Sequence, residues 1–390
     1  MQGPHENLQI SKGMTLLLAC GAGLAVASIY YNQPMLALMG SDFPGSARAM
    51  GLVPTLTQIG YALGILFLTL LGDLFDRRRV ILGKGLLLVA ALVATACART
   101  VPALLSTSLL LGLLATMTQD IVPAAAVLSP PSRGGQAVGT VMTGVLLGIL
   151  LSRVASGLAG HIFGWRAVYL AAAVSIAMFL VVAWKALPRM PATAPVGYTQ
   201  LLSSLVKLWQ QHPKLRLASF AQGAVSIGFG AFWSTLAVML HERYGLGSDV
   251  AGAFGLAGAA GALGAPLAGR LADRKGPEHV VRIGAALVAL AFLAMLLADF
   301  LPGRLPLAGL VLGAVGFDLG YQFCLIPHQA LVYSLEPAAR SRLNALLYVG
   351  MFLGLSAGSA LGSLVLSSFG WDGVLALGIA SGLGTLLLRL

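Results

Sequence analysis

The chain consists largely of apolar runs, each about as long as a membrane is thick. A helix needs about 20 apolar residues to cross the hydrocarbon core of a bilayer. Runs of this length follow one another along the chain, and short polar stretches separate them. They cover residues 14–39, 49–71, 80–98, 102–124, 136–160, 166–187, 215–240, 250–268, 280–299, 305–327, 343–368 and 372–389. The pattern predicts an all-α membrane protein with twelve transmembrane helices.

Composition supports a membrane protein over a soluble one. Hydrophobic residues make up 58% of the chain and charged residues 9%, whereas soluble domains have about 25% charged residues. The net charge of +11 does not indicate a nucleic-acid partner, because the basic residues lie in short loops and form no recognition motif. Cys20, Cys97 and Cys324 lie in or beside apolar runs, so no disulfide framework is expected.

Three short motifs occur twice, in the same order, about half the chain apart. Residues 72–79 and 269–276 both contain Gly-x-Leu-x-Asp-Arg. Residues 131–133 (Pro-Ser-Arg) are paralleled by 337–340 (Pro-Ala-Ala-Arg), and residues 163–165 by 369–371 (both Phe-Gly-Trp). Such repetition indicates an internal duplication. We predict an N-terminal six-helix bundle over residues 1–187, a linker over 188–214 and a C-terminal six-helix bundle over 215–390.

The distribution of Lys and Arg predicts the orientation of the chain. With an even number of spans, both termini lie on one side of the membrane. Basic residues on that side include Lys12, Lys84, Arg389 and the groups at 77–79, 270–275 and 340–342. The opposite side has only Arg48, Arg99, Arg166, Arg243 and Arg304. Because positive charge accumulates on the cytoplasmic side, we expect both termini in the cytoplasm.

The repeated Gly-x-Leu-x-Asp-Arg motif resembles the loop motif of the major facilitator superfamily. Residues 30–34 (Tyr-Tyr-Asn-Gln-Pro) and 337–344 (Pro-Ala-Ala-Arg-Ser-Arg-Leu-Asn) resemble bacterial efflux permeases near its drug–proton antiporter branch. The resemblance covers essentially the whole chain. It implies two pseudo-symmetric bundles that work by alternating access in a bacterial inner membrane. Two departures weaken the antiporter likeness: residues 102–124 contain no arginine and residues 136–160 contain no proline.

The resemblance also implies a cytoplasmic gate at the repeated motif. A carboxylate can accept the free N–H groups at a helix N-terminus. Asp76 is therefore expected to meet the start of the eleventh helix, and Asp273 the start of the fifth, when the cavity opens outward. The alternative is that these charges only set the topology. The candidate gate residues are Gly72, Asp76, Arg77, Arg133, Gly269, Asp273, Arg274, Arg340 and Arg342.

Three ionisable residues lie well inside the predicted spans: Asp120, Arg153 and Asp318. Such residues are costly in a membrane and usually functional, although a structural ion pair is the alternative for each. Asp318 is expected near the midplane, where a lone carboxylate should be neutral. We predict Asp318 as the main proton site, Arg153 as its switching partner or as an anchor for a substrate anion, and Asp120 as a second, weaker proton site.

Further polar and aromatic residues in the spans are candidates for the substrate cavity. Pro34 should interrupt the hydrogen bonds of the first helix, and Phe229, Phe232 and Trp233 can form an aromatic wall. His328 is expected to be a satisfied histidine rather than a proton carrier. The candidate cavity residues are Asn32, Gln33, Gln119, Gln222, Trp233, Tyr321 and Gln322.

Two segments have patterns that predict how helices pack. Glycines at every third position from Gly252 to Gly264, and small residues along 139–160, allow close helix contacts. The resemblance places these two spans, the eighth and fifth, at the interface between halves. In the linker, leucines at 201, 202, 205 and 208 fall on one helical face. We expect either an amphipathic helix on the inner membrane surface or a simple connector.

We interpret the chain as a monomeric inner-membrane secondary transporter that exports a small organic compound, with protons as the leading energy source. The alternatives are a sugar or metabolite exporter or facilitator without proton coupling, and, with little support, a non-transporting receptor. The sequence contains no Gly-x-x-x-x-Gly-Lys-[Ser/Thr] motif and no paired Cys and His ligands. We therefore expect neither an enzyme nor a cofactor or metal site.

Overall fold

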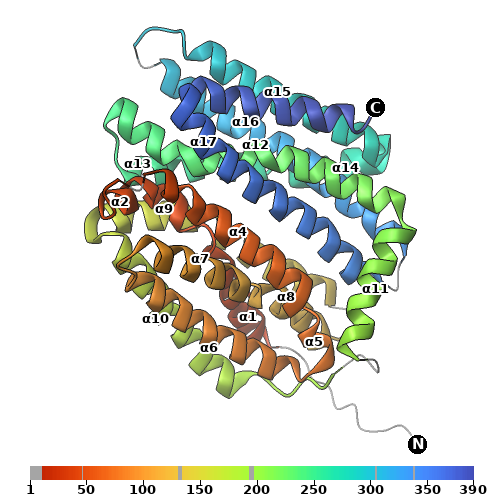
Figure 1. Ribbon diagram of the computed structural model, residues 1–390. Helices are drawn as coiled ribbons and strands as arrows, with labels where there is room; N and C mark the ends of the chain where they lie inside the picture. Colours follow the sequence, from red (N-terminus) through yellow and green to blue (C-terminus); the bar gives the residue numbers. More distant parts are fainter. Residues whose placement is uncertain (1–10, 46, 131–133, 193–196, 304, 337–338) are drawn as a thin grey trace, which may run out of the picture.

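The computed structural model describes residues 11–45, 47–130, 134–192, 197–303, 305–336 and 339–390, and the regular structure in these ranges is helical. The first half of the chain lies in the lower part of Figure 1 and the second half in the upper part. The first half comprises α1 (Lys12–Ala27), α2 (Asn32–Ser41), α3 (Ala47–Met50), α4 (Leu52–Leu63), the π-helical turn η1 (Gly64–Leu68), α5 (Leu71–Leu74), α6 (Arg77–Ala96), α7 (Val101–Ala115), α8 (Met117–Val127), α9 (Gly134–Phe163) and α10 (Trp165–Ala186).

The second half follows a helical linker. It comprises the linker helix α11 (Tyr198–Gln211), then α12 (Pro213–Tyr244), α13 (Ser248–Ala262), α14 (Ala265–Lys275), α15 (Pro277–Ala298), α16 (Leu305–Leu335) and α17 (Arg340–Leu387). Ten helical segments of the described chain are individually long and apolar enough to span a membrane, and α1 with α2 adds a bent eleventh.

The twelfth span comes from a break inside α17. A helix of 48 residues would be about 72 Å long, more than twice the thickness of the hydrocarbon core. Gly370, with φ 66° and ψ −163°, breaks it, and the chain then turns back on itself (Figure 1). Gly164, between α9 and α10, has φ 81° and ψ 158°. The two Phe-Gly-Trp motifs are therefore equivalent turns that need glycine, and the prediction of twelve helices is confirmed.

The first span is broken where Pro34 predicts. Residues 28–31 form a turn between α1 and α2, and the two helices are bent by 40°. Proline cannot donate a hydrogen bond to the carbonyl four residues earlier, and its ring clashes with that carbonyl. The carbonyl in question belongs to Tyr30, so the break lies immediately before the proline. It places the side chains of Tyr30 and Gln33 in the interior.

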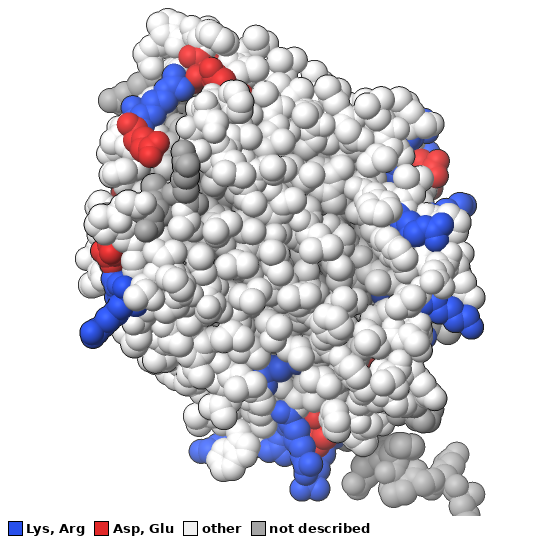
Figure 2. All heavy atoms as spheres, viewed as in Figure 1, with Lys and Arg blue, Asp and Glu red and all other residues white. Residues whose placement is uncertain are grey.

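The surface has the form that a bilayer requires. Figure 2 shows Lys, Arg, Asp and Glu gathered toward the ends of the molecule, with a broad uncharged band between them. Large apolar side chains such as Leu86, Val174 and Leu312 are exposed within the spans. In water such exposure would be costly, whereas in hydrocarbon it is the favourable arrangement.

Small residues bring helices of the two halves together, as predicted for the fifth and eighth spans. A Cβ atom added to Gly157 of α9 would lie 2.8 Å from the Cα of Gly252 on α13. The Ser248 hydroxyl donates to the Gly157 carbonyl at 2.9 Å, and His161 Nδ1 lies 3.6 Å from Asp249 Oδ1. These contacts lie at the end of the molecule opposite the repeated loop motif. The halves are therefore closed against each other on that side.

The linker forms the predicted amphipathic helix, but its apolar face does not lie on the membrane. Leu201, Leu205 and Leu208 of α11 pack into a cluster with Leu70 of the first half and Leu343 of the second. Tyr198 donates to the carbonyl of Phe67 at 3.2 Å. The placement on the membrane surface is wrong, because protein side chains from both halves cover the apolar face.

Candidate functional site

The interface between the halves contains a buried guanidinium. Arg153 of α9 is 2% exposed, and its Nε donates to Gln33 Oε1 at 2.8 Å. Its Cζ lies 4.3 Å from the ring centre of Trp233 and 4.9 Å from that of Tyr30. Trp233 belongs to α12 of the second half, so Arg153 joins the two halves through a cation–π contact. Nη2 of Arg153 has no hydrogen-bond partner in the described residues.

A small hollow lies beside this arginine. Its empty space of about 180 Å³ includes open space outside the protein, and the hollow has no room for a water-sized molecule in this conformation. The site is therefore narrow in this conformation. Among the described residues that line it, Arg153 is the only charged one; they are Gln33, Pro34, Arg153, Trp233, Leu236, Ala237 and Ala251.

Asp318 lies close to the same site on α16. It is 6% exposed, and its Oδ2 has no hydrogen-bond partner in the described residues. A Cβ atom added to Gly258 of α13 would lie 3.1 Å from Trp233 and 3.3 Å from Asp318 Oδ2. A Cβ atom added to Gly255, one turn earlier, would lie 3.0 Å from Cβ of Arg153. The side chains of Arg153, Trp233 and Asp318, each from a different helix, therefore lie one after another along the glycine face of α13.

The predicted proton site and its predicted partner are therefore neighbours without being an ion pair. In the described part of the chain, none of the ion pairs within 4.0 Å joins Arg153 to Asp318. The indole of Trp233 contacts the arginine and lies against the same glycine as the carboxylate. The structure brings together four of the predicted residues: Gln33, Arg153, Trp233 and Asp318.

An aromatic cluster continues from this site into the second half. The ring centres of Phe229 and Tyr321 are 4.5 Å apart, and those of Phe229 and Phe317 are 5.8 Å apart. The Tyr321 hydroxyl lies 3.0 Å from Ser226 Oγ. Phe229, Trp233 and Phe232 are all members of this cluster, which agrees with the predicted aromatic wall.

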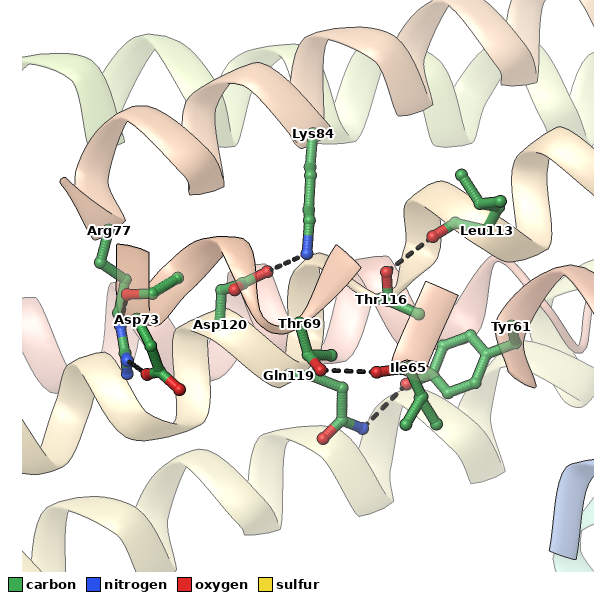
Figure 3. A network of polar contacts seen from close by, with 11 residues as sticks. Tyr61, Ile65, Thr69, Asp73, Arg77, Lys84, Leu113, Thr116, Gln119 and Asp120 are labelled. Atoms are coloured by element: carbon green, nitrogen blue, oxygen red, sulfur yellow. Dashed lines mark hydrogen bonds and ion pairs between the residues drawn. The ribbon is translucent and has the colours of Figure 1, made fainter. Parts of the chain in front are cut away.

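Asp120 has an ion-pair partner, in contrast to Asp318. Lys84 Nζ lies 2.6 Å from Asp120 Oδ2, and the two side chains are 5% and 2% exposed (Figure 3). Lys84, which was counted with the cytoplasmic basic residues, is buried two turns into α6, which begins at Arg77. The structural ion pair, left open as the alternative for Asp120, fits this geometry. The role of Asp120 as a second proton site stays a prediction.

The loop motif packs directly against this ion pair. A Cβ atom added to Gly72 would lie 2.6 Å from Asp120 Oδ1, so a larger residue would collide with the carboxylate. Arg77 Nη2 contacts Asp73 Oδ1 at 2.8 Å, and its Nε donates to the Gly72 carbonyl at 3.2 Å. Figure 3 shows Asp73 and Arg77 near the Lys84–Asp120 pair, together with the hydrogen bond from Gln119 to Tyr61.

Among the described residues, the predicted gate contacts are not formed in this conformation. Asp76 caps its own helix α6, accepting from the N–H of Arg78 at 3.0 Å and from that of Met190 at 3.1 Å. Arg340 donates to the Tyr333 carbonyl and Arg342 to Ser204. Asp273 and Arg274, which follow Gly269 on α14, are exposed, and Arg133 lies outside the described residues. The latch was expected only when the cavity opens outward, so it stays a prediction.

The other predicted cavity residues make separate contacts. Asn32 donates to Thr57 at 3.3 Å, and Gln222 Oε1 lies 2.9 Å from Nδ1 of the fully buried His328. Gln322 is half-buried. The histidine is satisfied, as predicted, and its second nitrogen accepts a hydrogen bond from Arg389 Nε at 3.2 Å. Sequence reasoning missed this contact, because Arg389, the last residue of the predicted twelfth span, was counted only as a cytoplasmic charge.

Twelve spanning helices in two halves, with a buried arginine and a buried carboxylate at their interface, define a membrane transporter rather than an enzyme. The chain belongs to the Major Facilitator Superfamily, whose sequence profile matches residues 18–335. It is therefore a multi-pass secondary transporter of a small molecule.

Three known proteins show how far the similarity extends. The "Uncharacterized transporter YgaY" of Escherichia coli O157:H7 is 36% identical over 382 residues, covering 98% of this chain and 96% of that protein. The "Chloramphenicol resistance protein" of Streptomyces lividans is 28% identical over 76% of this chain and 77% of its own length. The solved structure of the nucleoside transporter NupG superposes with a TM-score of 0.80 at 14% identity, covering 96% and 98% of the two chains. At that identity, the last similarity concerns the fold alone.

Proposed function

We propose that the chain exports a small organic compound across the bacterial inner membrane and links this movement to protons through Asp318. One observation carries the proposal. The carboxylate of Asp318 is buried beside the interface between the halves, and its Oδ2 has no hydrogen-bond partner in the described residues. Ionisable groups inside a membrane are expensive and usually serve transport.

Arg153 supplies a cation whose distance from Asp318 depends on conformation. Arg153 belongs to the first half and Asp318 to the second, and both lie against the glycine face of α13. Rocking of the halves changes the distance between the two charges. A close guanidinium favours the ionised carboxylate, whereas burial without a cation favours the neutral acid. Asp318 therefore releases its proton in one conformation and binds one in the other.

The gate proposed for the cytoplasmic side uses both copies of the loop motif. In the outward-open state Asp76 would leave its present partners and meet the start of α17, near Arg340 and Arg342. Asp273 would meet the start of α9 in the same way. The present structure supports one element of this proposal: Asp76 already accepts N–H groups at a helix N-terminus, that of α6.

Export is supported by the relative named for chloramphenicol resistance. A sugar or metabolite facilitator without proton coupling is the alternative. A transport assay in proteoliposomes separates the two, with radiolabelled chloramphenicol and benzoate as first probes and with or without an imposed pH gradient. The wild type should respond to the gradient. Asp318→Asn should lose this response while keeping downhill exchange. If Asp318→Asn responds like the wild type, Asp318 is not the proton site.

The orientation proposed from the basic residues needs its own test. In a variant without Cys20, Cys97 and Cys324, Ser41→Cys should react with an impermeant maleimide added to intact cells. Gln200→Cys, in α11, should react only after permeabilisation. The reverse pattern would place both termini outside.

A further inference from the structure

Arg153 is a buried cation without an ion-pair partner in the described part of the chain. Arginine stays charged in proteins, and burying an unpaired charge costs several kcal/mol. Two aromatic rings and one amide oxygen offset part of this cost. Nη2 is still left without a hydrogen-bond acceptor. An anion in the site would supply this missing acceptor.

The residues that line the hollow beside Arg153 indicate what kind of anion the arginine would bind. Its other lining residues are uncharged, and Trp233, Leu236 and Ala237 give it an apolar wall. One guanidinium with no second basic residue beside it in the described lining matches a singly charged carboxylate, because phosphate usually recruits several donors. We propose that Arg153 binds the carboxylate of a small organic acid, whose apolar part packs against Trp233, Leu236 and Ala237.

This inference rests on the proposed function. It also determines whether the proton moves together with the substrate or in exchange for it. The carboxylates of Asp318 and of the substrate compete for the same guanidinium. When the substrate occupies Arg153, the Asp318 carboxylate loses its cation and takes up a proton. When the site is empty, Asp318 can approach Arg153 and ionise. The protein then crosses between conformations with both the anion and a proton, or with neither.

The consequence is co-transport of an organic acid with a proton, instead of exchange of the two. A monocarboxylate and one proton carry no net charge together, so the cycle does not depend on the membrane potential. Net export in this mode requires that the substrate and proton gradients, taken together, point outward, so an inward proton gradient opposes it. A cationic substrate, which would compete with the proton at Asp318, would instead be exchanged for it.

Ligand binding to the purified full chain tests the proposal without transport. Thermal stabilisation would be measured with acid and amide pairs of equal shape: benzoate with benzamide, lactate with lactamide, and phenylacetate with phenylacetamide. At least one acid should bind ten-fold or more tightly than its amide. Arg153→Gln should remove this preference, and Arg153→Lys should keep part of it. Arg79→Gln, which changes an exposed arginine in the first turn of α6, should leave it unchanged.

The pH dependence of the same binding tests the linkage. In the wild type, acid binding should strengthen as the pH falls, by at most ten-fold per pH unit. In Asp318→Asn it should be tight at every pH, because the competing carboxylate is gone. The proposal is overturned if no acid binds better than its amide, if Arg153→Gln keeps the preference, or if binding weakens at low pH. The proposed function fails on a different result, namely an unchanged response to the pH gradient in Asp318→Asn.

Discussion

Arg153 and Trp233 join the two halves of the molecule, with the guanidinium carbon 4.3 Å from the centre of the indole ring. The contact lies on the side where α9 and α13 are closed against each other. Because the two residues belong to different halves, opening of this side must separate them. Their interaction therefore contributes to the free-energy difference between the two conformations.

Removal of the indole should shift the protein toward the opposite conformation. A cation–π contact is worth about 0.5–2 kcal/mol, so Trp233→Leu should change the ratio of conformers by roughly 2- to 30-fold. Electron-spin distance measurements between labels on the outer ends of α9 and α13 would detect the change. Trp165→Leu is the matched control, since Trp165 contacts Arg166 within the first half. An equal shift in both variants would contradict the assignment.

Asp120→Asn should destabilise the fold, because it leaves Lys84 buried without its counter-ion. Loss of one partner of a buried ion pair costs about 3–5 kcal/mol. The double variant Lys84→Met, Asp120→Leu should regain most of this stability, because it removes both charges together. Thermal unfolding in detergent measures both effects. If the double variant is stable but no longer responds to a pH gradient, Asp120 takes part in proton transfer in addition to stabilising the fold.

Asp76→Asn should preserve the fold but weaken the outward-open state. Asparagine is also a good N-cap, so α6 should begin at the same residue. A neutral amide interacts less with the helix dipole, which costs about 0.3–1 kcal/mol, and more if Arg340 or Arg342 pairs with the carboxylate. The same spin labels report the conformers. Unchanged populations together with unchanged transport would remove the latch from the mechanism.

The fold was largely predictable because a bilayer leaves few alternatives. Backbone groups in hydrocarbon must be satisfied within the segment, so long apolar runs form helices. Proline at position 34 and the repeated Phe-Gly-Trp motif located a break and two tight turns. The errors concern residues at the ends of spans. Lys84 and Arg389 were counted as cytoplasmic charges, yet both are buried, because Lys84 pairs with Asp120 and Arg389 donates to His328.

The components of the site were predictable, but their contacts were not. Asp318 and Arg153 are conspicuous as charges inside apolar runs, and Gln33 precedes a proline. Nothing in the sequence places Trp233 against Arg153, because 80 residues separate them and the contact crosses between the halves. Tyr30 was visible only as part of a motif. Its role beside Arg153 depends on the 40° bend at residues 28–31.

The central claim is that Asp318 binds the transported proton, and infrared difference spectroscopy tests it most directly. A protonated carboxylic acid has a carbonyl band that an ionised carboxylate lacks. Reconstituted wild-type protein, titrated from acid to alkaline pH, should lose one such band from a buried acid. The band should be missing from Asp318→Asn at every pH and present in Asp120→Leu with Lys84→Met. A band that survives in Asp318→Asn would show that another carboxyl group holds the proton.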